Sequence, residues 1–119
     1  MRYMCFVRAD ENQGSPPQAL YDAMGPFIEA SFKSGKRIDT GGLAPTADTL
    51  QVRLANGKVT VVDGPFSESK EVVGGYAIIE VNSREEAIDV ANQFLDLHKE
   101  HWPEWKGGCE IRQIFGPND

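Results

Sequence analysis

Two strand-like segments of this chain carry apolar side chains in both of their alternating sets, and this pattern constrains the fold more than any other feature. In the segments 3–7 and 72–81 the sets are Tyr3, Cys5 and Val7 against Met4 and Phe6, and Ala77, Ile79 and Val81 against Tyr76 and Ile78. Successive side chains of a strand point to opposite faces of its sheet. Strands of this kind therefore belong to a sheet that is covered on both faces.

Two further segments have the apolar spacing of helices. In the first, Ser15 is the predicted N-cap, Pro16 the first helical residue and Gln18 the residue that completes a capping box. Gly35 is placed to end this helix. Pro26 lies inside it and has no backbone N–H, so we expect a kink or a split at this proline.

The second helix begins with another capping box, formed by Ser83 and Glu86, and ends before Pro103. Its apolar stripe consists of Ala87, Ala91, Phe94, Leu95 and His98. His98 and His101 lie near the end of this helix, where such side chains suit the helix dipole. Since no further ligand at metal-binding spacing accompanies them, we predict no metal site.

A β-hairpin is the clearest local signal in the sequence. Two alternating runs flank Asn56-Gly57, the pair preferred in a two-residue type I′ turn. This turn fixes the register, with Ala55 opposite Lys58 and Leu50 opposite Asp63. One face of the hairpin then carries Leu50, Val52, Leu54, Val59, Val61 and Asp63. Asp63 thus lies on the apolar face, where a carboxylate is costly unless a partner is near.

The complete order predicts an α+β fold: a ferredoxin-like βαββαβ unit with an inserted hairpin, in a single domain over residues 1–119. The remaining strands are expected at 37–43, 72–81 and 109–115. Right-handed crossovers place both helices on one face of the sheet. The other face, which carries Met4, Phe6, Tyr76 and Ile78, needs another cover, so we predict a homodimer.

Composition excludes several classes of function. The net charge of −6 and the pI of about 4.9 disfavour nucleic acid as a partner. No apolar run approaches the ~20 residues that cross a bilayer, and Met1–Val7 has a strand pattern, so we expect neither a membrane span nor a leader. Cys5 and Cys109 lie in predicted strands and fit buried free thiols in the cytoplasm.

The stretch from Asp63 to Tyr76 is the densest in polar groups, and it resembles the DGPF signature of the YCII-related family. It matches the pattern D-G-P-F-x-E-x-K-E, followed after two residues by G-G and an aromatic. Arg2-Tyr3-Met4 and Gly41–Pro45 resemble the same family. The resemblance implies a dimeric α+β barrel, a fold shared with muconolactone isomerases and small monooxygenases. It does not imply a particular reaction.

Smaller members of that family suggest a catalytic His-Asp pair facing the barrel interior. Only the acidic member carries over, onto Asp63, because both histidines of this chain lie at the end of the second helix. We therefore predict Asp63 as the acid-base residue, at the mouth of a pocket between hairpin and sheet. The ligand-binding residues expected around it are Gly64, Pro65, Phe66, Glu68, Lys70 and Tyr76.

Simpler interpretations of the same residues stay open. Asp63–Phe66 has the composition of a tight turn, although an Asx-turn would need an N–H that Pro65 lacks. Glu68, Lys70 and Glu71 are also typical of a solvated charged surface.

Two functions fit this sequence. The first is binding of an unidentified small molecule in a barrel pocket, as a binding protein or as an isomerase-like or cofactor-free oxygenase-like enzyme that uses an acidic residue. The second is an accessory or regulatory interaction module, because relatives in the resembled family occur fused to or beside sigma factors. No cofactor is expected, since the Gly-Gly pairs form no nucleotide-binding loop and a haem-binding histidine on the sheet is absent.

Overall fold

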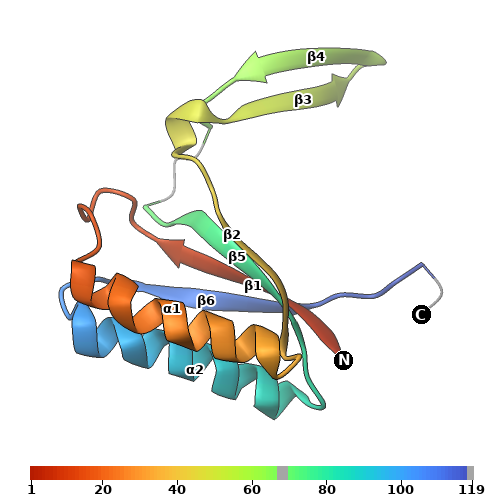
Figure 1. The fold of residues 1–119 in the computed structure, drawn as a ribbon. Helices are drawn as coiled ribbons and strands as arrows, with labels where there is room; N and C mark the ends of the chain where they lie inside the picture. The colour runs from red at the N-terminus through yellow and green to blue at the C-terminus, as the bar shows by residue number, and fades with distance from the viewer. Residues whose placement is uncertain (67–69, 118–119) are drawn as a thin grey trace.

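The chain forms one four-stranded sheet, two helices and a separate hairpin (Figure 1). The computed structural model describes residues 1–66 and 70–117. In chain order the elements are β1 (Arg2–Ala9), α1 (Gln18–Lys33), β2 (Arg37–Gly42), the 3-10 turn η1 (Thr46–Asp48), β3 (Leu50–Ala55), β4 (Lys58–Asp63), β5 (Val72–Glu80), α2 (Arg84–His101) and β6 (Gly107–Gln113).

The main sheet has the strand order β2-β5-β1-β6, and every neighbouring pair is antiparallel. Both helices lie on the same face of this sheet (Figure 1). This arrangement is the ferredoxin-like α+β unit expected from the sequence. Strands β3 and β4 form a two-stranded sheet of their own, which stands apart from the main sheet beyond η1.

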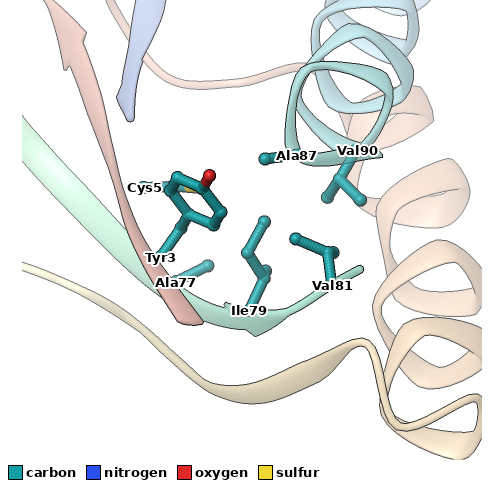
Figure 2. Packing of buried hydrophobic residues seen from close by; sticks show 7 residues of the cluster. All are labelled: Tyr3, Cys5, Ala77, Ile79, Val81, Ala87 and Val90. Carbon is teal, nitrogen blue, oxygen red and sulfur yellow. The ribbon is translucent and has the colours of Figure 1, made fainter. Parts of the chain in front are cut away.

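The core lies between the sheet and α2. Its buried members are Tyr3, Cys5, Ala77, Ile79, Val81, Ala87 and Val90, whose side chains converge in Figure 2. Ile79 is the most deeply buried of them, with 1% of its surface exposed. Helix α1 contributes a single buried residue, Leu20, so it covers its part of the sheet less closely than α2 does.

The opposite face of the sheet carries the second alternating set, as predicted. Met4 lies across from Ile78, and Phe6 lies across from Tyr76. All four side chains are only half-buried, because no helix of the described residues covers them.

The start of α1 differs from the prediction that Ser15 is its N-cap. The N-cap is Pro17, which is extended at φ −62° and ψ 152° and forms no side-chain cap, and the helix begins at Gln18. The cause is local: a proline disfavours the helical conformation in the residue before it, so Pro16 cannot be the first helical residue. Gly35 follows the end of the helix with φ +81°, as expected for a residue after a C-cap.

Of the two alternatives expected at Pro26, a kink or a split, the structure excludes the split, because α1 runs unbroken from Gln18 to Lys33. Pro26 and the preceding Gly25 are both exposed. The helical carbonyl that loses its N–H partner at Pro26 therefore lies toward water, which can bind it.

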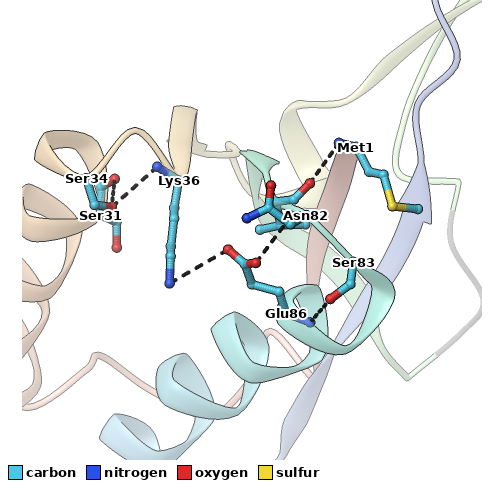
Figure 3. A network of polar contacts seen from close by, with 8 residues as sticks. Met1, Ser31, Ser34, Lys36, Asn82, Ser83 and Glu86 are labelled. Carbon is cyan, nitrogen blue, oxygen red and sulfur yellow. Dashed lines mark hydrogen bonds and ion pairs between the residues drawn. The ribbon is translucent and has the colours of Figure 1, made fainter.

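The start of α2 agrees with the predicted capping box (Figure 3). Ser83 Oγ accepts a hydrogen bond from the Glu86 N–H at 3.1 Å, and Glu86 Oε2 accepts one from the Asn82 N–H at 3.3 Å. Glu86 Oε1 also lies 3.8 Å from Nζ of Lys36, the residue before β2.

The Met1 ammonium donates to the Val81 carbonyl at 2.7 Å. These contacts tie the N-terminus, β2 and α2 together at one end of the sheet.

The hairpin register is confirmed pair by pair, from Leu50 with Asp63 to Ala55 with Lys58. Asn56 and Gly57 have φ values of 53° and 74°, which a type I′ turn requires at both central residues.

The last strand begins two residues earlier than predicted, at Gly107 instead of Cys109, and ends at Gln113. Pairing with β1 sets these bounds, because Gly107 lies opposite Ala9. A Cβ at Gly107 would lie 2.4 Å from the Trp105 ring and 2.6 Å from the Arg8 carbonyl oxygen. Gly107 is thus the first residue of β6, and no larger residue would fit at this position.

The two serines offer a matched test of helix capping. We expect Ser83→Ala to lower the free energy of unfolding by about 1 kcal/mol, because the Glu86 N–H loses its acceptor. Ser15→Ala should change it by less than about 0.5 kcal/mol, since Ser15 caps nothing. Urea unfolding followed by circular dichroism measures both values. Equal losses in the two variants would contradict this account of the helix starts.

Candidate functional site

A cavity of about 740 Å³ lies between the sheet and the two helices. The sheet contributes side chains of β1, β5, β6 and β2, and the helix layer contributes Ile28, Val90, Ala91, Phe94 and His98. Most of the lining is apolar. The polar groups among it are Glu11, Asn12, Arg37, Thr40, His98 and the thiols of Cys5 and Cys109. The cavity occupies the space that α1 leaves beside the tightly packed core.

The cavity runs along the strands from an exposed end to a buried one. Its exposed end is bordered by Glu11 and Asn12 and by the segment 43–45 that follows β2. Glu11 is held there by Thr46, whose N–H and hydroxyl both donate to its carboxylate. At the other end of β2, Arg37 lies opposite Ile79 and is 6% exposed.

His98 lies in an aromatic cluster at the wall of the cavity. Its ring centroid lies 4.6 Å from that of Phe94 and 4.3 Å from that of Trp105. Nδ1 lies 3.0 Å from the Phe94 carbonyl oxygen, which can only accept, so in the neutral ring Nδ1 carries the proton and Nε2 is unprotonated. Burial lowers the pKa of His98, and the imidazole is therefore neutral at pH 7.

Two thiols lie on the helix-facing side of the sheet. Cys5 pairs with Ile111 across β1 and β6, and Cys109 pairs with Val7, so the two cysteines are diagonal neighbours on that face. Burial raises the pKa of both thiols, that of Cys109 to about 11, although the charge of Arg37 opposes the shift. Both are thus protonated and uncharged at neutral pH.

The structure places Asp63 at the exposed end of β4, outside the residues that line the cavity. Its carboxylate makes no hydrogen bond or ion pair within the described part of the chain. The next residue, Gly64, donates its N–H to the Thr49 carbonyl at 2.6 Å. The acid-base role of Asp63 therefore stays a prediction.

The other residues predicted around Asp63 are spread out. Pro65 and Lys70 are exposed, Gly64 and Phe66 are half-buried at the base of the hairpin, and Glu68 lies outside the described residues. A second, more open hollow of about 460 Å³ adjoins this base, with Thr49 and Glu71 in its lining.

Of the predicted binding residues that the structure describes, Tyr76 alone is among those that line the main cavity, although its side chain, across from Phe6, belongs to the opposite face of the sheet. Its ring lies against Gly41, where a Cβ would come within 2.9 Å of it. Its hydroxyl donates to Asp39 Oδ2 at 3.3 Å, and the charge of Asp39 raises the pKa of Tyr76.

Sequence reasoning missed Arg37 and the position of His98 in the cavity wall. The helical stripe already placed His98 among inward-facing residues, and this signal could have identified it. Arg37 offered no comparable signal, because the first residue of an edge strand is normally exposed. Its burial results from α1, whose Phe27 ring lies 5.5 Å from the Arg37 Cζ.

Within residues 1–66 and 70–117, no group of three or more potential metal ligands lies together. Neither of the helices in these ranges is both long and apolar enough to cross a membrane.

Comparison with known proteins identifies a family and a relative of this chain. The sequence model of the YCII-related domain matches residues 1–115. An uncharacterised protein of Rhizobium meliloti (strain 1021) is 37% identical over 88 residues, which cover 74% of this chain and 64% of the relative. The match thus spans less than two thirds of that relative's length.

The buried imidazole predicts a pH-dependent stability. The pKa of His98 is lower in the folded chain than in the unfolded chain, so the unfolded state binds the proton more readily. Stability should therefore fall as the pH drops below the unfolded value of about 6.5. We expect His98→Phe, which keeps a ring beside Trp105, to lose less stability than the wild type between pH 7.5 and pH 5.5.

Thermal unfolding at both pH values measures this difference. Gln93→Ala, an exposed change on the same helix, serves as the control and should behave as the wild type. An unaltered pH dependence in His98→Phe would contradict the assignment.

Proposed function

This chain belongs to the YCII-related family, and from that premise we propose that it binds a small, largely apolar molecule in the cavity between its helices and its sheet. The observation that carries the proposal is the cavity itself. Its volume of about 740 Å³ lies within the ~300–1,000 Å³ typical of sites for small ligands. A few polar groups set in an apolar lining are also the usual composition of such sites.

Where the bound molecule reacts, we propose that His98 accepts a proton from it. The unprotonated Nε2 and the lowered pKa suit a neutral imidazole to this role. Proton transfer by a side chain fits the isomerase-like chemistry expected from the sequence. The base would then be His98 instead of Asp63, because His98 lines the cavity.

We propose further that two copies of the chain pair through the uncovered face of the main sheet. The half-buried Met4, Phe6 and Ile78 lie at its centre. Ion pairs Arg2–Glu80, at 3.3 Å, and Arg8–Glu110, at 3.8 Å, lie toward its ends. An apolar centre with a charged rim is the usual anatomy of a protein interface.

One observation favours the second candidate function, an interaction module. The hairpin exposes its apolar face to an unusual degree, with Leu54 73% exposed and Val59 and Val61 both 68% exposed. The radius of gyration is 16.4 Å, whereas a compact domain of this length has about 13.5 Å. A protruding, apolar hairpin is a surface that a partner protein could cover.

A cavity-filling variant tests the proposed binding site. Ala91 is 9% exposed and lines the cavity, so Ala91→Phe should place a ring in the ligand's space. We expect the affinity for the neutral fluorescent probe N-phenyl-1-naphthylamine to fall about tenfold or more. Ala91→Met is the alternative if the phenylalanine variant folds poorly, and it should also lower the affinity for the probe.

Two controls separate this result from unspecific effects. Ala30→Phe lies on an exposed surface of α1 and should leave probe binding unchanged. Asp63→Asn should also leave it unchanged, because Asp63 lies outside the cavity lining. Loss of binding in Asp63→Asn would instead support the original role of Asp63, in its own cavity or in a partner's. Full binding in both Ala91 variants would contradict the proposal.

Sedimentation at micromolar concentration tests the dimer. We expect the wild type to sediment as a dimer and Phe6→Lys as a monomer, because the lysine places a charge at the centre of the apolar sheet face. Leu54→Lys on the hairpin is the matched control and should stay dimeric. The reverse result would make the hairpin the contact surface, and a monomeric wild type would exclude the dimer.

A further inference from the structure

Arg37 is a buried cation without a hydrogen-bond or ion-pair partner among residues 1–66 and 70–117. The side chain is 6% exposed, and its Nε is fully buried without a hydrogen bond. No ion pair or hydrogen bond of the guanidinium occurs within the described residues. The one contact of its charge that the structure shows is the Phe27 ring, 5.5 Å from Cζ.

The groups around Arg37 do not balance its charge. The thiols of Cys5 and Cys109 face it from β1 and β6, and burial keeps both protonated. Glu86, whose carboxylate lies near the start of β2, is already bonded to Lys36 and to a backbone N–H. Glu11, the acid in the cavity lining, lies at the exposed end and is held by Thr46.

An uncompensated buried charge is among the most expensive features that a fold can contain. Arginine stays protonated at any pH at which the protein is folded, so it cannot escape the cost by losing its proton. The usual solution is an anion, and a carboxylate can bind a guanidinium through two parallel hydrogen bonds. The space in front of Arg37 is the cavity, which an anion could enter.

We propose that Arg37 anchors the carboxylate of an amphiphilic ligand, whose apolar body lies along the cavity toward the exposed end. This inference rests on the proposed binding function and names the class of molecule bound there. Arg37 is the only arginine or lysine among the described lining residues, and the lining is mostly apolar. A phosphate group would bring close to two negative charges against the single positive charge of Arg37.

The shape of the cavity agrees with an elongated ligand. From Arg37 to Gly42, β2 spans five residue steps at about 3.3 Å each, or about 16 Å, and both of its ends border the cavity. A ligand anchored at Arg37 would place its other end near the exposed segment 43–45, through which it could enter.

A matched pair of probes tests the anchor in the intact protein. Octanoate and 1-octanol share the same apolar chain and differ in the charged end, and calorimetry or displacement of N-phenyl-1-naphthylamine measures both affinities. We expect the wild type to bind octanoate at least about tenfold more tightly than 1-octanol, as a charged hydrogen-bonded pair in a buried site requires. Arg37→Met should bind the two molecules equally.

The control and the second variant keep this test decisive. Arg84→Met removes an exposed arginine of α2 and should retain the full preference for octanoate. Arg37→Gln, which keeps a polar end of similar length, serves if the methionine variant folds poorly and should also lose the preference. Replacement by methionine should further raise the melting temperature of the ligand-free protein, because it removes an unpaired buried charge.

The outcomes separate the two proposals. If the neutral probes bind and Ala91→Phe excludes them, but octanoate shows no advantage in the wild type, then the cavity function stands and the carboxylate anchor is wrong. Retention of the octanoate preference in both Arg37 variants would also overturn the anchor. If neither octanoate, 1-octanol nor the fluorescent probe binds the wild type, then the binding function itself fails.

Discussion

The main sheet has two apolar faces, and the chain supplies helices for only one of them. This imbalance underlies the rest of the structure. On the helix-covered face, Tyr3, Cys5 and Ile79 are buried. On the other face, Met4, Phe6 and Ile78 remain half-exposed, because strand geometry sends every second side chain there. A partner on that face would complete the packing that one chain cannot provide.

The two helices also differ in how well they cover their face. Helix α2 buries Ala87, Val90 and Ala91 against the sheet, and a capping box fixes its start. Helix α1 follows two prolines, lacks a side-chain cap and buries only Leu20. The looser packing of α1 leaves the cavity and places Arg37 beneath a helix instead of in water. The helix that packs less closely on the sheet thus leaves room for the candidate binding site.

Local rules predicted the parts of this fold that local interactions determine. The hairpin register follows from Asn56-Gly57, and the α2 start follows from Ser83, since each depends on neighbours in sequence. The same rule failed at Ser15, where a competing local effect, the second proline, moved the helix start. Arg37 and the cavity could not be predicted, because both arise from the distance between α1 and the sheet, which no short pattern encodes.

The two ends of the chain's most recognisable motif lie in different places: Gly74, Gly75 and Tyr76 line the cavity, whereas Asp63–Phe66 lies outside it at the base of the hairpin. At Gly64 a Cβ would lie 2.7 Å from the Thr49 carbonyl oxygen, which accepts the Gly64 N–H. Glycine therefore lets β4 leave the hairpin in close contact with the segment that enters β3. The hydrogen bond from the Gly64 N–H to the Thr49 carbonyl joins the two ends of the hairpin at its base. A structural role for Asp63–Phe66 in the orientation of the hairpin is consistent with this contact. Selectivity for a ligand would depend on Arg37 and His98. The helical stripe places His98 on the inward face, whereas no sequence pattern distinguishes Arg37 from an ordinary residue of an edge strand.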